Sequence, residues 1–374
     1  MPSSLRLATR ADEAALRQLL RENPMPGSIS LTYEREPDYF IAAEVDGTLS
    51  QTIISIDDET GEYRGMGARI IRPMYFNGQV QDVGYMSHLR VDLRRSWGLT
   101  LARHFARSFQ KFHQLHADGR VPFYLMSVIA DNAPARRLLT SELPGMPHAH
   151  EYARMFTYAV SPHRVKREIP LPSGLKLERG TSEHIPEIIA CLQRNSRRLQ
   201  FAPYWSAQNL FTLSQTPNLY PGNFSLAFND SSVVGCLALW DQTPFKQTIV
   251  RGYSGSMARS RPLINLLSHF IDVPYLPRLN TSLQYCYASH LAIDNDNMQI
   301  FSSLLRAVCN ETVRRGFNYF MIGLSESNPL RPVLTRNYLH ITYPSRIYLM
   351  AWNDGLDAMA RVDTRVPGLE IAVL

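Results

Sequence analysis

The stretch Tyr85-Met86-Ser87-His88-Leu89-Arg90-Val91-Asp92 is repeated as Tyr287-Ala288-Ser289-His290-Leu291-Ala292-Ile293-Asp294. Both stretches carry tyrosine, serine, histidine, leucine and aspartate in the same order, with Val or Ile before the aspartate. Asp294 follows Asp92 by 202 residues. Self-similarity at a fixed offset is the mark of a duplicated structural unit. The sequence therefore predicts one fold that is present twice.

Matching segments surround both stretches. Each half opens with a short apolar strand and a helical run, and each ends with an aromatic strand. The paired segments are 5–7 with 175–177, 123–129 with 320–324, 132–140 with 328–335, and 152–160 with 343–352. Three prolines and several charges between the halves are typical of a linker. We predict two domains, 1–160 and 175–374, joined by the linker 161–174.

Periodicity and turn residues predict the elements of the first half. A helix is expected over 11–21 and strands over 39–45, 52–56 and 62–76. Asn77-Gly78 predicts a two-residue hairpin, because both positions of a type I′ turn need positive φ. A helix from 98 to about 117 carries an aromatic stripe, which is expected to face the core.

The segment 241–282 has no counterpart of matching length in the first half. It is rich in proline, and a helix is expected around 262–271. We interpret it as an elaboration between two strands that covers the domain interface, or else binds a partner.

Composition excludes several classes of function. The chain has 374 residues, 45% of them hydrophobic, so each half can bury its own core. The net charge of +6 is scattered without a polybasic tract, so a nucleic-acid partner is not expected. The four cysteines lack metal-site spacing, so no metal is expected. Without a secretory signal or an apolar run of ~20 residues, the protein is expected in the cytoplasm with no membrane partner.

The residues that follow each copy of the repeated stretch differ. Arg94, Arg95 and then Gly98 follow the first copy and open an amphipathic helix, whereas the second is followed by Asn295-Asp296-Asn297. A helix N-terminus exposes unpaired N–H groups and the positive end of its dipole, so it binds phosphates. Glycine admits an anion closely, and arginines add charge. We expect an anion site after the first copy, with a solvated turn as the alternative, and none after the second.

The order of elements over residues 3–160 resembles the GNAT superfamily of acyl-CoA-dependent N-acyltransferases. The diphosphate loop of that family, Arg/Gln-x-x-Gly-x-Gly/Ala, corresponds to Arg95-Ser96-Trp97-Gly98-Leu99-Thr100, with threonine at the last small position. The resemblance implies an α/β (α+β) class with two tandem GNAT-like folds, each a mixed, mostly antiparallel central sheet flanked by helices. The second half resembles a degenerate copy that does not bind coenzyme and completes or covers the substrate groove.

The resemblance also implies a set of coenzyme contacts. The backbone of Leu89 and Val91 would bond the pantetheine arm, residues 95–100 would hold the diphosphate, and Asn132 with Ala135 would flank the coenzyme. The full expected set is Leu89, Arg90, Val91, Arg94, Arg95, Ser96, Trp97, Gly98, Leu99, Thr100, Asn132 and Ala135. Acetyl-CoA is the default donor, an amine is the acceptor, and no metal takes part.

The catalytic groups are less clearly marked, because the family's usual acid, a tyrosine, corresponds here to Leu139. Replacement candidates are His88, Tyr85 and Tyr124. His88 titrates in the range of a base, but its recurrence as His290 favours a structural hydrogen bond. Strict alternation would place Leu89 on the face of Tyr85, and His88 on the opposite face.

The segment Glu34-Arg35-Glu36 corresponds to a region that often contacts the acceptor in this superfamily, although a solvated charge run is the simpler interpretation.

Three functions remain open from the sequence. The leading hypothesis is an N-acyltransferase in which an amine attacks the thioester of acyl-CoA directly, with positioning as the main source of acceleration. The second is a sensor that binds acyl-CoA without turnover, and the third is a scaffold in which neither half binds coenzyme. The sequence predicts no oligomeric state.

Overall fold

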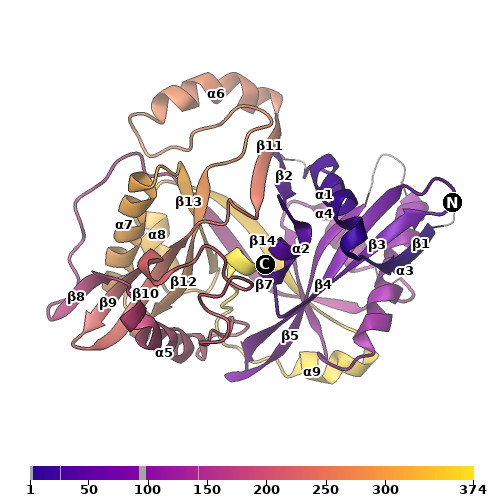
Figure 1. The fold of residues 1–374 in the computed structure, drawn as a ribbon, viewed down its shortest axis with the longest axis horizontal. Coiled ribbons are helices and arrows are strands. Elements are labelled where there is room, and N and C mark those ends of the chain that lie inside the picture. The colour runs from indigo at the N-terminus through magenta and orange to yellow at the C-terminus, as the bar shows by residue number, and fades with distance from the viewer. Residues whose placement is uncertain (1–2, 26, 92–97, 142) are drawn as a thin grey trace.

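The computed structural model describes residues 3–25, 27–91, 98–141 and 143–374, with the backbone alone at residues 3 and 98–102 (Figure 1). The elements of the first half are β1 (Ser3–Leu7), α1 (Glu13–Glu22), β2 (Ile29–Glu34), α2 (Tyr39–Glu44), β3 (Leu49–Asp57), β4 (Tyr63–Phe76), β5 (Gln79–Val91), α3 (Gly98–His116), β6 (Tyr124–Ile129), α4 (Ala133–Leu139) and β7 (His148–Val160).

Among the described residues, the second half repeats this order without counterparts of β2 and α2, and it adds a strand, β11, and the helices α6 and α9. Its elements are β8 (Leu175–Arg179), α5 (Ile185–Ser196), β9 (Phe224–Asn229), β10 (Ser232–Trp240), β11 (Gln247–Tyr253), α6 (Gly255–Leu267), β12 (Tyr285–Ile293), α7 (Met298–Arg314), β13 (Tyr319–Ser325), α8 (Arg331–Asn337), β14 (His340–Ala351) and α9 (Leu356–Ala360).

The two halves exchange their last strands. In the described part of the chain, one mixed, mostly antiparallel sheet has the order β1-β3-β4-β5-β6-β14-β7-β13-β12-β10-β9-β8. The final strand of the first half, β7, pairs with β13 of the second, and β14 pairs with β6 of the first. Figure 1 shows β7 and β14 side by side at the centre of the molecule. The sheet therefore runs unbroken across the predicted domain division, which stays a prediction.

Helices cover both faces of the sheet, because neighbouring strand residues point to opposite faces. Ile53 of β3 packs with α3 and α4, whereas Ile54 packs with α1 and α2. The second half repeats this arrangement, with Leu237 of β10 packed toward α7 and Cys236 packed toward α5. Both halves thus bury apolar cores on each side of the sheet.

Both copies of the repeated stretch contain a β-bulge at the histidine. His88 has φ 53° and His290 has φ 55°. The pairing of β4 with β5 shifts register here, between Ala68↔Ser87 and Met66↔Arg90. Strict alternation is therefore wrong at this point: Leu89 packs with the α3 side of the sheet, whereas Tyr85 belongs to the core on the other face. The bulge bends the strand and changes the direction in which its backbone groups point.

Two local predictions were wrong and two are confirmed. Residues 39–44 form a helix rather than a strand, with Asp38 Oδ1 accepting hydrogen bonds from the amides of Phe40 (2.8 Å) and Ile41 (2.9 Å). The segment Glu34-Arg35-Glu36 is not a solvated run, since Glu34 and Arg35 are buried. The hairpin after β4 is confirmed, with positive φ at Asn77 and Gly78. The aromatic stripe of α3 does face the core.

The added segment of the second half joins the two halves. Strand β11 pairs antiparallel with β2 of the first half, for example at Val250↔Leu31. Gln247 also bonds both the amide and the carbonyl of Glu36. This two-stranded sheet lies outside the main sheet, and α6 follows it directly.

Candidate functional site

The strands β5 and β6 part from one another after a short parallel contact. They pair at Gly84↔Tyr124 and Tyr85↔Leu125, and no further pair joins them in the described residues. Residues 86–91 of β5 continue along β4, while β6 continues along β14. The bulge at His88 accounts for the change in the course of β5. The two strands therefore diverge, and we call the region between them the opening of the first half. One edge of β5 there carries backbone groups that β6 does not pair in the described residues.

Helix α3 begins at Gly98, seven positions after β5 ends. Its first turn contains Leu99 and Thr100, whose amides are among those left unpaired at any helix N-terminus. The predicted anion-binding residues Arg94, Arg95, Ser96 and Trp97 lie outside the described residues. On the β6 side, Asn132 Oδ1 accepts a hydrogen bond from the amide of Ala135 (3.1 Å), so Asn132 caps α4 where β6 ends.

Glycines in β4 let α3 pack closely against the bulged end of β5. A Cβ atom at Gly67 would lie 2.7 Å from Leu89 Cδ2 and 3.0 Å from Phe112 Cζ. Leu89 and Val91 line a small hollow here with His104 and Phe105 of α3. Arg90 lies on the other side of β5, where its Nη2 approaches Met25 Sδ (3.4 Å).

His88 belongs to a buried polar cluster beneath α2. Arg35 donates hydrogen bonds to both His88 Nε2 and Asp46, and Lys246 Nζ lies 2.7 Å from the other carboxylate oxygen of Asp46. Burial, together with repulsion from Arg35, lowers the pKa of His88 to about 4. Burial opposes ionisation of Asp46, but Arg35 and Lys246 outweigh it and hold its pKa well below the usual range. His88 is therefore neutral near pH 7, with its Nε2 lone pair already engaged.

The two tyrosine candidates lie on opposite faces of the sheet. Tyr85 stands at the apex of the opening and interacts with Ser127 of β6; its burial raises its pKa. Tyr124 accepts a hydrogen bond from Arg69 Nε (2.9 Å) and lies 3.1 Å from His116 Nδ1; its burial raises its pKa to about 12. His116 ends α3, whose 19 residues span about 28 Å, so Tyr124 lies far from the start of that helix.

A group of tyrosines from both halves lies beyond Arg90. We call it the tyrosine cluster: Tyr33, Tyr285, Tyr287, Tyr319 and Tyr343. The rings of Tyr285 and Tyr319 stack with centroids 5.5 Å apart. Tyr33 is 42% exposed, yet burial and the neighbouring tyrosines raise the pKa of its hydroxyl.

The corresponding opening of the second half is filled by the chain itself. Pairing of β12 with β13 likewise ends, at Tyr287↔Met321. The amide of His290, however, donates to Glu370 Oε2 (2.9 Å), and Ile371 packs directly on Gly323 of β13. Figure 1 shows this end of the chain between the two halves.

The backbone amides at the start of α7 also have hydrogen-bond partners within the chain. Asn297 Oδ1 accepts hydrogen bonds from the amides of Gln299 (2.9 Å) and Ile300 (3.1 Å). Asp294 and Asp296 lie before the helix and pair with Arg194 (2.8 Å) and Arg198 (3.0 Å). Carboxylates and a side-chain cap thus occupy the position at which an anion would bind.

Several residues of the site could not be found from sequence. Arg35, Asp46 and Lys246 surround His88 from distant parts of the chain, and the nearest signal was the charge run at Glu34-Arg35-Glu36. Glu370 gave no signal. Among the residues that the structure describes, no group of three or more His, Cys, Asp or Glu side chains is arranged to hold a metal.

Known structures share this fold over the length of the chain. No family model and no curated protein matches the sequence. A GCN5-related N-acetyltransferase from Sphaerobacter thermophilus matches with a TM-score of 0.57 at 10% identity, covering 100% of this chain and 98% of that one. Saccharomyces cerevisiae N-myristoyltransferase with bound myristoyl-CoA gives a TM-score of 0.58 at 12% identity, covering 94% and 80%. A probable N-acyltransferase from Enterococcus faecalis V583 gives 0.53 at 7%, covering 94% and 73%. The chain therefore has the fold of the GCN5-related N-acetyltransferases and N-myristoyltransferases, and the predicted fold class is confirmed.

Proposed function

We propose that this chain is an acyl-CoA-dependent N-acyltransferase whose coenzyme site is the opening between β5 and β6. The supporting observation is the edge of β5 over residues 86–91, which β6 does not pair and which leads toward the start of α3. An extended pantetheine arm can hydrogen-bond to such an edge as an added strand does. The first amides of α3 would then face the diphosphate.

Direct acyl transfer depends mainly on how the amine and the thioester are positioned. The amine nitrogen attacks the thioester carbonyl, a C–N bond forms and the C–S bond breaks. The nitrogen gives up one proton to solvent, and the coenzyme leaves as a thiolate that takes up a proton. A backbone amide at the end of this edge nearest Tyr85 would donate to the thioester oxygen as negative charge develops there. Holding amine and thioester in contact supplies most of the acceleration.

Tyr85 is our candidate for the group that protonates the leaving thiolate. It lies at the apex of the opening, and its raised pKa keeps its hydroxyl protonated at neutral pH. His88 is a poor base in this setting, because Arg35 occupies its Nε2 and its pKa is low. Tyr124 is engaged by Arg69 and His116 at the far end of α3.

We assign the acceptor amine to the side of the tyrosine cluster, which Arg90 links to β5. As donor we propose acetyl-CoA.

A sensor that binds acyl-CoA without turnover is the second candidate. Leu139, at the position of the family's usual acid, is buried at 5% exposure in an apolar core, and His88 is held by Arg35.

Release of free coenzyme thiol from acetyl-CoA distinguishes the two functions. We expect release to depend on one member of a panel of small amines, amino acids, aminoglycosides and lysine peptides, and to fall in Tyr85→Phe. Calorimetric binding of acetyl-CoA without release from any amine would support the sensor. Absence of binding would contradict both.

A further inference from the structure

Helix α6 and the segment after it form an apolar surface with no protein partner in the described chain. None of the side chains of α6 is buried. Large apolar side chains between 37% and 68% exposed follow one another along 263–279: Leu263, Leu266, Leu267, Phe270, Ile271, Tyr275 and Leu279. Figure 1 shows α6 at the outer edge of the molecule, above β11. Exposed apolar patches of this kind mark interaction sites.

Basic side chains share this surface. Residues 254–280 contain Arg259, Arg261 and Arg278 but a single carboxylate, Asp272. Asp272 is already bound by His163 and Lys166 of the segment that follows β7. Within the described ranges, neither Arg259 nor Arg278 pairs with a carboxylate. We use the name α6 surface for residues 255–279.

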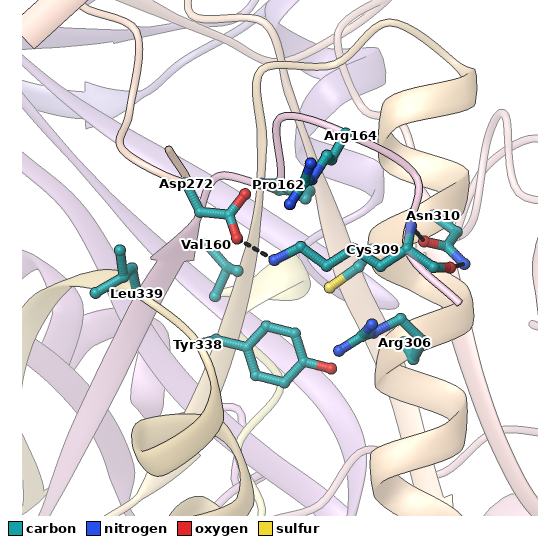
Figure 2. Close-up of a pocket in the computed structure, with 10 residues that line it drawn as sticks. Val160, Pro162, Arg164, Asp272, Arg306, Cys309, Asn310, Tyr338 and Leu339 are labelled. Atoms are coloured by element: carbon teal, nitrogen blue, oxygen red, sulfur yellow. Dashed lines mark hydrogen bonds and ion pairs between the residues drawn. The ribbon is translucent and has the colours of Figure 1, made fainter. Parts of the chain in front are cut away.

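The segment after β7 also carries exposed arginines beside an exposed apolar side chain. Arg164 and Arg167 are exposed, and Val165 between them is 47% exposed. Figure 2 shows that Arg164 and Asp272 line one pocket together with Arg306 and Tyr338. The α6 surface and residues 164–167 are thus held together by the bonds of Asp272. Both combine exposed apolar groups with arginines that have no carboxylate partner among the described residues.

We propose that the α6 surface docks on an anionic lipid membrane. Apolar side chains beside arginines are the combination that lies in a bilayer interface, where apolar groups enter the acyl region and guanidinium groups meet lipid phosphate. A second copy of the chain fits less well, because a twofold contact would bring the same arginines of both copies together.

Docking of this kind is peripheral. No helix in the described ranges is long and apolar enough to cross a membrane. The sequence-based expectation of no membrane partner rested on the lack of a spanning segment, which does not test interfacial binding. Because β11 leads into α6 and pairs with β2, docking would tether both halves at the lipid surface.

Co-sedimentation of the full chain with phosphatidylcholine vesicles, with and without phosphatidylserine, tests the proposal. We expect binding to the phosphatidylserine vesicles that weakens with salt. The double variant Leu266→Ser, Phe270→Ser should weaken it at least about tenfold. The double variant Arg259→Glu, Arg278→Glu should weaken it at least about 25-fold.

Matched controls lie elsewhere on the surface. Leu213→Ser, at a side chain that is 86% exposed, and Arg336→Glu, at an exposed arginine of α8, should bind vesicles as the parent does. All altered side chains are exposed, so circular dichroism should show folded variants. Failure of the parent to bind phosphatidylserine vesicles, or equal losses in the control variants, would overturn the proposal. Dimers that Leu266→Ser, Phe270→Ser dissociates, without vesicle binding, would overturn it in favour of a second copy.

Discussion

The two halves of the molecule share a bulged strand but differ in what lies around it. His88 and His290 have nearly the same φ, and in both halves the neighbouring parallel strand departs soon after its first pairs. Arg35 and Asp46 surround His88, whereas Trp205, Phe224 and Trp240 surround His290. The two halves therefore share the backbone of the bulged strand, whereas the side chains packed around it differ.

The helices that follow the two bulged strands, α3 and α7, also differ in the groups at their N-termini. Asn297 caps α7, with Asp294 and Asp296 beside it, so that helix N-terminus is already satisfied. Helix α3 begins at a glycine, and two arginines precede it in the sequence. Under the proposed function, an anion would bind at α3 rather than at α7.

The largest expected effect comes from the polar cluster of the first half. Asp46→Ala leaves Arg35 and Lys246 buried without their carboxylate, so it should lower the free energy of unfolding by about 3–5 kcal/mol in urea titrations. Asp58→Ala, at an exposed aspartate, is the control and should cost little. If Asp46→Ala lowers the free energy of unfolding by less than about 1 kcal/mol, the contacts of Asp46 with Arg35 and Lys246 do not stabilise the packing of the two halves.

Coenzyme affinity should respond to the first helix start and not to the second. Gly98→Val and Arg95→Glu should each weaken acetyl-CoA binding about 10- to 100-fold by calorimetry. The valine side chain would block close approach of the diphosphate, and the glutamate would replace an attractive charge with a repulsive one. The control Asp296→Asn removes one carboxylate beside α7 and should leave affinity unchanged. If Asp296→Asn changes acetyl-CoA affinity and the two α3 variants do not, the coenzyme site lies in the second half instead.

Glu370, which fills the opening of the second half, should make the stability of the protein depend on pH. Burial raises the pKa of Glu370 to about 6, so its contribution to stability is fully present below the unfolded value near 4.5 and is lost as pH rises through 6. Glu370→Gln removes this dependence. The stability of the variant relative to the parent should therefore rise by up to about 2 kcal/mol between pH 4 and pH 7. A constant difference across this range would contradict the burial of an ionisable group there.

The smallest expected effect is that of His88→Asn on kcat. Asparagine accepts positive φ, so His88→Asn can keep the bulge. If the histidine is structural, kcat at pH 7 should change by less than about threefold, and His290→Asn should behave alike. A general base would instead cost about 100-fold or more and shift the pH–rate profile.

Sequence predicted the fold class but not every element. The repeated stretch and the Asn77-Gly78 turn were sufficient for the duplicated fold class and the first hairpin. The helix at Tyr39 was missed because its buried positions, Tyr39, Ala42 and Ala43, lie in a short apolar run that also suits a strand. The strand exchange was not predictable, since β7 and β14 are similar aromatic strands that fit either sheet. The cluster of Arg35, Asp46 and Lys246 depends on contacts between distant segments, which periodicity does not report.

A crystal structure with bound acetyl-CoA tests the central claim most directly. The account predicts density for the pantetheine arm along residues 86–91 of β5, with the diphosphate at the first turn of α3 and the residues at Glu370 and Ile371 unmoved. Density between β12 and β13, with those residues displaced, would contradict it.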